Sequence, residues 1–184
     1  MALDVQATIT ALIEREAGYI NHPNDRGGPT RWGVTEQVAR AHGYTGSMQE
    51  LPEEVAREIY LDRYWTGPHF DLVALRAEAI AGELLDTGVN MGPQVASKFL
   101  QRALNVLNRG ATAYPDTAVD GAIGRMTLYA LDQLLAKRGA DGVTVLLRAL
   151  NALQAVRYVE LAEAKPSQES FAYGWLLNRI GALT

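Results

Sequence analysis

The segment between residues 16 and 35 carries residue types that could perform acid–base chemistry. Glu16 ends a stripe formed by Ile9, Leu12 and Ile13 at helical spacing, so its carboxyl group is predicted to point with the apolar face. Partial burial there would favour the protonated form that a general acid needs at neutral pH. The alternative interpretation is a glutamate at a helix end that simply reaches water.

A second carboxyl group, that of Asp25, follows nine residues later in a segment rich in Gly, Pro and Asn. This segment predicts a small β-hairpin over residues 19–35 with Asp25 at its tip. A glycosidase uses one protonated carboxyl group for the leaving oxygen and one ionised group for water or the sugar cation. Thr30 could hold the attacking water. As an alternative, Asp25 only forms the turn.

Trp32 offers a flat apolar face that suits stacking on a sugar ring. The structural alternative is that its side chain plugs the hairpin onto the core. Asn90 ends a polar helical stripe with Glu83 and Asp86, and this stripe could line a groove and bind an N-acetyl or hydroxyl group. Alternatively, Asp86 only caps backbone groups near Gly88.

The run from residue 16 to residue 35 resembles the signature of glycoside hydrolase family 108, which comprises muramidases of phage endolysins and bacterial wall-lytic proteins. The matching residues are Glu16-Ala17-Gly18-Tyr19, Asp25-Arg26-Gly27-Gly28, Thr30 and Gly33-Val34-Thr35. The family usually has Glu-Gly-Gly-Tyr, and Ala17 replaces the first glycine here. The resemblance implies Glu16 as catalytic acid and Asp25 and Thr30 as its catalytic partners. Tyr19, Trp32 and Asn90 are the predicted substrate contacts.

The resemblance continues over nearly the whole chain. Ile59-Tyr60 and Tyr64-Trp65 look like paired aromatic positions at the end of the family's second helix. Three later segments are similar to the peptidoglycan-binding region that typically follows: Asp86 to Gly92, Val119 to Gly124 with Thr127, and Gly174-Trp175 with Asn178-Arg179. The glycines of the second segment are also explained as turn residues, and Trp175 as core.

The resemblance implies an endolysin-type muramidase that hydrolyses the β-1,4 bond between N-acetylmuramic acid and N-acetylglucosamine in peptidoglycan. Such an enzyme would serve phage lysis and be bacteriolytic. A chitinase-like hydrolase of N-acetylglucosamine polymers is the alternative enzyme. A non-catalytic wall-binding module is the alternative from another class, and the presence of Glu16 argues against it.

The elements expected to position these residues are mostly helices. We expect a mainly α, lysozyme-like fold with one small β-hairpin and a cleft between two lobes, built as one domain over residues 1–184. Residues 1–91 would form the catalytic segment, and residues 92–184 would pack on it. The predicted helices are Asp4 to Glu16, Pro52 to Tyr64, Arg76 to Val89, Pro93 to Asn108, Arg125 to Lys137, Val143 to Ala164 and Gln168 to Ile180. The helix after Val143 is apolar on nearly every side and is predicted to be buried.

Composition narrows the possible functions. The 184 residues include no cysteine and carry a net charge of −4, with nine acids and three arginines between Glu50 and Asp86. No basic patch suggests nucleic acid as a partner, and no stretch suggests membrane insertion or a signal peptide. The histidines lack metal-ligand spacing, so neither a metal nor another cofactor is expected. We expect a monomer that is made in the host cytoplasm and reaches the wall after holin-dependent release.

Overall fold

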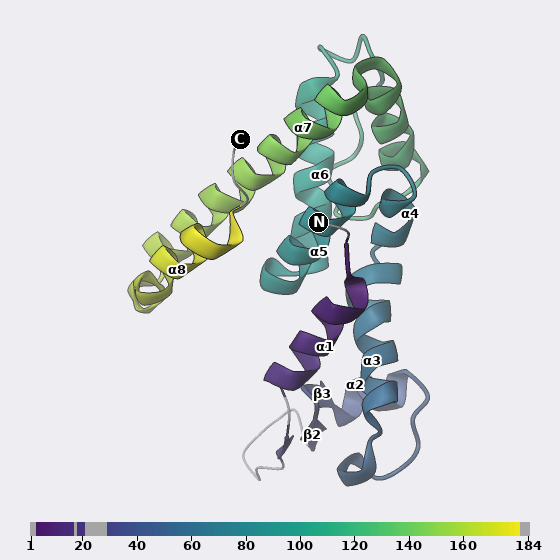
Figure 1. Cartoon of the computed structure of the whole chain (residues 1–184), viewed down its shortest axis with the longest axis vertical. Coiled ribbons are helices and arrows are strands. Elements are labelled where there is room, and N and C mark those ends of the chain that lie inside the picture. The colour runs from purple at the N-terminus through teal and green to yellow at the C-terminus, as the bar shows by residue number, and fades with distance from the viewer. Residues whose placement is uncertain (1–2, 17, 21–28, 181–184) are drawn as a thin grey trace. The chain divides into compact units, whose positions relative to one another are not determined.

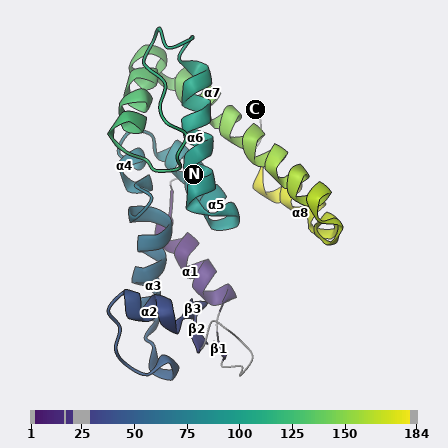
Figure 2. The ribbon, with the colours of Figure 1, turned by 180° about the vertical axis from the view of Figure 1, so that it is seen from behind.

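The computed structural model describes residues 3–16, 18–20 and 29–180, and helices dominate it (Figure 1; Figure 2). The chain divides into two compact units, Met1–Gly67 and Pro68–Thr184. Each unit has its own buried apolar residues. No helix in the described ranges combines the length and apolar character that crossing a membrane requires.

The first unit is built around α1 (Val5–Arg15) and α3 (Glu53–Leu61), which pack against each other. The carboxylate of Asp4 caps α1 by accepting a hydrogen bond of 2.8 Å from the backbone N–H of Ala7. The predicted apolar stripe of Ile9, Leu12 and Ile13 is buried. The prediction of this first helix is therefore confirmed to within one residue at each end.

Shorter elements complete this unit: α2 (Glu36–Ala41), the 3-10 turn η1 (Met48–Glu50) and the π-helical turn η2 (Asp62–Thr66). The sequence analysis missed α2, which is too short to show a clear helical period. It also placed Pro52 inside its helix. The structure makes Pro52 the N-terminal cap of α3 instead, because its backbone is extended, with ψ of 147°.

The predicted hairpin region contains a three-stranded antiparallel sheet in the order β1–β2–β3. The strands are β1 (Tyr19–Ile20), β2 (Thr30–Arg31) and β3 (Val34–Thr35). Trp32 and Gly33 connect β2 to β3 with φ of 55° and 71°. Positive φ at both central residues is what a two-residue type I′ hairpin turn requires. The third strand was missed because Trp32-Gly33 lacks the Asn or Asp that usually marks such a turn.

The second unit is entirely helical in the described ranges. It comprises α4 (Phe70–Ala74), α5 (Glu78–Met91), α6 (Pro93–Leu107), α7 (Arg125–Ala164), the 3-10 turn η3 (Pro166–Gln168) and α8 (Glu169–Arg179). α5 packs against α4, α6 and α7, and α8 packs against α7. The largest fully buried side chains here are Phe70, Ile80, Leu84, Leu85, Leu100, Leu104, Leu131, Leu146 and Gln101.

α7 joins the two helices predicted over residues 125–137 and 143–164. Gly139 interrupts the helical backbone between them, with φ of 51° and ψ of −132°. The prediction that the second part is a buried helix is correct for one side of it only. Val145, Val156 and Val159 are exposed, while a stripe at spacings of three and four residues faces inward: Leu146, Leu150, Asn151, Gln154, Tyr158 and Ala162.

Candidate active site

Glu16 is the C-terminal cap of α1, and its backbone N–H donates a hydrogen bond of 3.1 Å to the carbonyl of Leu12. Its side chain is 47% exposed, so it is less buried than the apolar stripe predicts. The reason is its position: the helix ends here, and no following turn covers the carboxyl group. The Arg15 Nε atom lies 3.4 Å from Glu16 Oε1. The carboxyl group is therefore within reach of a ligand from solvent.

The aliphatic stem of Glu16 is held by a close approach to Gly33. A Cβ atom at residue 33 would lie 2.9 Å from Glu16 Cβ and 3.1 Å from Glu16 Cγ, and it would also overlap the hydroxyl oxygen of Tyr60. Residue 33 thus has to be glycine for space as well as for its positive φ. The turn between β2 and β3 consequently sets where the Glu16 side chain can lie.

Tyr60 of α3 also lies beside Gly33 and the turn between β2 and β3. Its hydroxyl donates a hydrogen bond of 3.0 Å to the carbonyl of Trp32, which links α3 to the turn. Burial raises the pKa of Tyr60, and the negative charge of Glu16 and the neighbouring Tyr64 raise it further. Tyr60 and Tyr64 stack with ring centroids 5.9 Å apart. Tyr60 therefore stays protonated beside Glu16 and serves as a fixed donor to the turn.

Two predicted site residues lie in the small sheet. Thr30 in β2 pairs with Ile20 of β1 and with Thr35 of β3, so it occupies the central strand. Tyr19 in β1 pairs with Arg31 and is 37% exposed. A hydrogen bond of 3.2 Å from the Trp32 backbone N–H to the Gly18 carbonyl ties the end of β2 to the segment that follows Glu16. The sheet is therefore linked to Glu16 in two ways: by the chain segment that follows Glu16, and by the packing of Gly33 against the Glu16 side chain.

Trp32 contributes to the position of the turn. Its indole Nε1–H donates a hydrogen bond of 3.0 Å to the carbonyl of Leu51, and the Arg31 guanidinium carbon lies 5.2 Å from the centre of its ring system. These contacts agree with the interpretation that Trp32 plugs the hairpin onto the core. Stacking of a sugar on its ring stays a prediction.

The remaining predicted site residues fall elsewhere. Asp25 lies outside the described residues. Asn90 belongs to the second unit, where its Nδ2–H group donates to the Asp86 carbonyl oxygen at 2.8 Å and to Asp86 Oδ1 at 3.3 Å. The Asp86 carboxylate accepts hydrogen bonds from side chains of α5, α7 and α8, and among the described residues it caps no backbone group near Gly88.

The sequence analysis missed the roles of Gly33 and Tyr60 beside Glu16. It also missed the polar residues that α7 and α8 bring to the stripe of α5, namely Gln154, Tyr158 and Arg179. A signal for two of them exists: Asn151, Gln154 and Tyr158 recur at spacings of three and four on the same helical face as Leu146 and Leu150. Within the described ranges, no three His, Asp or Glu residues gather in a way that could hold a metal ion.

A mainly α fold in which the first helix ends on a glutamate packed against a small sheet is the lysozyme-like arrangement. Residues 9–92 match the family model of Glycosyl hydrolase 108, and residues 95–180 match that of the Predicted Peptidoglycan domain. Residues 9–92 therefore form a glycosyl hydrolase family 108 segment, and a predicted peptidoglycan domain follows it. Together the two matches identify a glycoside hydrolase that acts on peptidoglycan.

The comparison with solved structures supports the fold. The structure of Brucella abortus SagA is similar to this chain with a TM-score of 0.55 and 24% sequence identity, over 95% of this chain and 91% of that chain. No curated protein matches the chain.

Proposed function

We propose that the chain is a muramidase that hydrolyses the β-1,4 bond between N-acetylmuramic acid and N-acetylglucosamine, with Glu16 as its general acid. The observation that carries this proposal is the setting of Glu16. Its stem is fixed against Gly33, while its carboxyl group remains half exposed. A general acid needs both a fixed position and access to the leaving oxygen.

In this mechanism the Glu16 carboxyl group donates its proton to the glycosidic oxygen as the bond to the muramic acid C1 breaks. Water supplies the hydroxyl group at that C1 and its remaining proton is released to restore the Glu16 carboxyl group, so each cleavage creates one reducing N-acetylmuramic acid end. Asp25 and Thr30 are proposed to position this water or to stabilise the oxocarbenium-like transition state. Tyr19 and Trp32 are proposed to contact the sugar rings.

The direct test replaces Glu16 by Gln, which keeps the shape of the side chain and removes the transferable proton. We expect the rate of hydrolysis of purified peptidoglycan to fall by about 10² or more, with unchanged thermal unfolding. Glu14→Gln is the matched control, because Glu14 lies on the same helix and is exposed. It should retain full activity. Near-normal hydrolysis by the folded Glu16→Gln protein would exclude Glu16 as the acid.

Mass analysis of the products tests which bond is cut. New reducing N-acetylmuramic acid ends are expected, whereas reducing N-acetylglucosamine ends would contradict the muramidase assignment. Faster hydrolysis of chitin oligomers than of peptidoglycan would instead favour a chitinase-like enzyme. Asp25→Asn keeps a turn-forming side chain without the charge, so normal turnover by this variant would show that Asp25 only forms the turn.

A further inference from the structure

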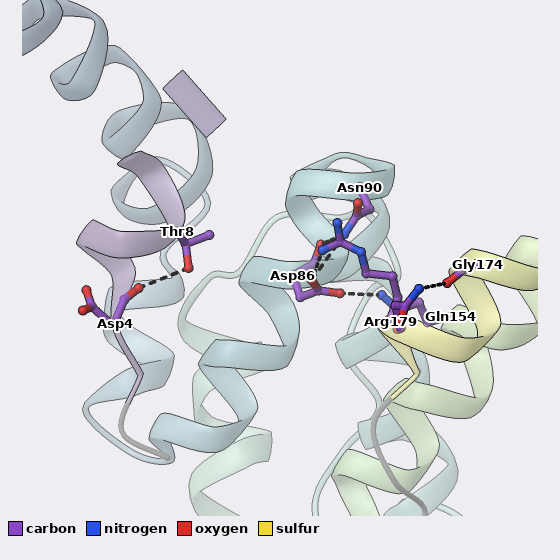
Figure 3. A network of polar contacts seen from close by, with 8 residues as sticks. Asp4, Thr8, Asp86, Asn90, Gln154, Gly174 and Arg179 are labelled. Carbon is purple, nitrogen blue, oxygen red and sulfur yellow. Dashed lines mark hydrogen bonds and ion pairs between the residues drawn. The ribbon is translucent and has the colours of Figure 1, made fainter. Parts of the chain in front are cut away.

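The second unit contains a group of polar residues that the proposed catalysis does not use. We name it the α5–α7–α8 cluster: Glu83, Asp86 and Asn90 of α5, Gln154 and Tyr158 of α7, and Arg179 of α8. Figure 3 shows the side chains of Gln154, Arg179 and Asn90 directed toward Asp86. The Asp86 carboxylate accepts hydrogen bonds from Gln154 Nε2 at 3.1 Å and from Arg179 Nη1 at 3.0 Å.

Three buried polar atoms of this cluster have no hydrogen-bond partner among the described residues: Gln154 Oε1, Tyr158 Oη and Glu83 Oε1. Gln154 is 0% exposed and Tyr158 is 3% exposed. Buried polar groups are nearly always hydrogen-bonded, because leaving them unpaired costs free energy. Three such atoms around one carboxylate therefore point to a group that binds there and supplies donors and acceptors.

The charges of the cluster favour a neutral ligand. Arg179 balances the charge of Asp86. Burial raises the pKa of Glu83 to about 7, and the adjacent charge of Asp86 raises it while a hydrogen bond with Asn151 lowers it. Burial, with Asp86 next in importance, raises the pKa of Tyr158 to about 12, so its hydroxyl keeps its proton. At or below neutral pH the cluster therefore has little net charge, so it would not attract an ionic ligand strongly.

Aromatic rings border the same cluster. The Tyr158 and Trp175 rings stack with centroids 5.1 Å apart, and the Phe171 and Trp175 rings stack at 6.0 Å. α8 buries none of its side chains fully, and its contacts with α5 and α7 include the Arg179–Asp86 ion pair and this aromatic stack. The side chains of Asp86 and Arg179 remain 34% and 39% exposed. Displacement of Arg179 would therefore open the cluster to solvent without disrupting a core.

We propose that the α5–α7–α8 cluster binds an N-acetylated sugar unit of the glycan and that α8 is its movable cover. The choice of sugar rests on the proposed function. An N-acetylhexosamine is neutral, and its amide N–H and hydroxyl groups can donate to Gln154 Oε1. The Tyr158 hydroxyl can donate to the acetyl carbonyl, and aromatic rings commonly pack against the apolar faces of sugars.

The test uses the full chain carrying Glu16→Gln, labelled with ¹⁵N, and N,N′,N″-triacetylchitotriose as the probe. We expect the sugar to shift the side-chain amide signals of Asn90 and Gln154. Tyr158→Phe removes only the unpaired hydroxyl, so the loss of one hydrogen bond to the sugar should weaken this binding about tenfold. Its melting temperature should stay the same or rise, because the removed hydroxyl has no partner in the described chain.

Tyr114→Phe is the matched control. The Tyr114 hydroxyl is also buried in the second unit, but it donates a hydrogen bond of 2.9 Å to the Leu104 carbonyl. This control should lower the melting temperature and leave sugar binding unchanged. Arg179→Ala should strengthen binding, since it removes the group that the sugar has to displace. Weaker binding by this variant would overturn the assignment of α8 as a cover.

The site itself is overturned if the trisaccharide shifts no signal of the cluster at millimolar concentration, or if Tyr158→Phe binds it as tightly as the parent chain. It is also overturned if a glycan-free stem peptide shifts these signals and the trisaccharide does not. Failure of the proposed function gives a different result. In that case Glu16→Gln still hydrolyses peptidoglycan, whatever the trisaccharide does at the cluster.

Discussion

Replacing Glu83 by Gln should change how the stability of the protein depends on pH. Burial and the charge of Asp86 raise the pKa of Glu83 from 4.5 to about 7. Between these two values the unfolded chain has lost this proton and the folded chain still holds it. Stability therefore falls as pH rises from about 4.5 to 7, and the loss is complete above the folded-state pKa. Gln cannot ionise, so the variant should not show this loss.

The size of the effect follows from the two pKa values. Their separation corresponds to about 3 kcal/mol of unfolding free energy at 1.36 kcal/mol per pKa unit. For a chain of this size, that is a shift of roughly 6 to 12 °C in melting temperature. The assay is scanning calorimetry of both proteins at several values between pH 5 and pH 8. The melting temperature of the variant, relative to that of the parent protein, should rise steadily as pH rises.

A matched control separates burial from charge. Glu160 forms an exposed ion pair with Arg157 at 3.1 Å, so Glu160→Gln should change stability by less than about 1 kcal/mol at every pH. The reasoning is refuted if the parent and the Glu83→Gln protein keep a constant difference in melting temperature from pH 5 to pH 8. Glu83 would then ionise alike in the folded and unfolded chains.

Two further substitutions test what holds the catalytic site and the second unit in place. Gly33→Ala should lower the unfolding free energy by roughly 1 to 3 kcal/mol and also slow hydrolysis, because the added Cβ meets the Glu16 stem. Gly43→Ala controls for backbone strain alone, since Gly43 has φ of 90° but nothing within 4 Å of the added Cβ; both variants are unfolded in urea and assayed for hydrolysis. Gln101→Leu should lower the unfolding free energy by about 2 to 3 kcal/mol, because buried Gln101 accepts a hydrogen bond from the Gly121 N–H and donates one to Asp120 Oδ1. An unchanged midpoint of urea unfolding would show that these hydrogen bonds do not contribute to stability.

Most of the helical architecture could be predicted from hydrophobic period and capping residues. The helices around Leu12, Leu84 and Leu100 were found because each presents an apolar stripe long enough to read. The short helices Glu36–Ala41 and Phe70–Ala74 were missed, since one or two turns show no period. The exposure of Val156 in α7 was also missed. Which side of an apolar helix is buried depends on the elements that pack against it, and the sequence of the helix alone does not show where those elements lie.

The candidate catalytic motif could be recognised from the sequence, but the residues that pack around Glu16 could not. The sequence pointed to Glu16 by its place on a stripe and by the resemblance of the following turn. Its exposure differs from the expectation because a helix end has no next turn to cover it. Gly33 and Tyr60 were not recognised as its packing partners. Contacts between α3 and the turn after β2 join residues nearly thirty positions apart, and no local pattern encodes such a pair.

The boundary between the two family matches lies between residues 92 and 95 of the sequence, but the boundary between the compact units lies after residue 67. α4 and α5 thus belong to the glycosyl hydrolase match and pack in the second unit. The buried face of α5, which includes Ile80, Leu84 and Leu85, is covered partly by α6 and α7 from the predicted peptidoglycan domain. Burying apolar surface is the main stabilising contribution to folding, so residues 9–92 alone would leave this face in water. The peptidoglycan segment is therefore part of the folded core of α5, and any glycan contact it makes through the α5–α7–α8 cluster includes residues of both matches.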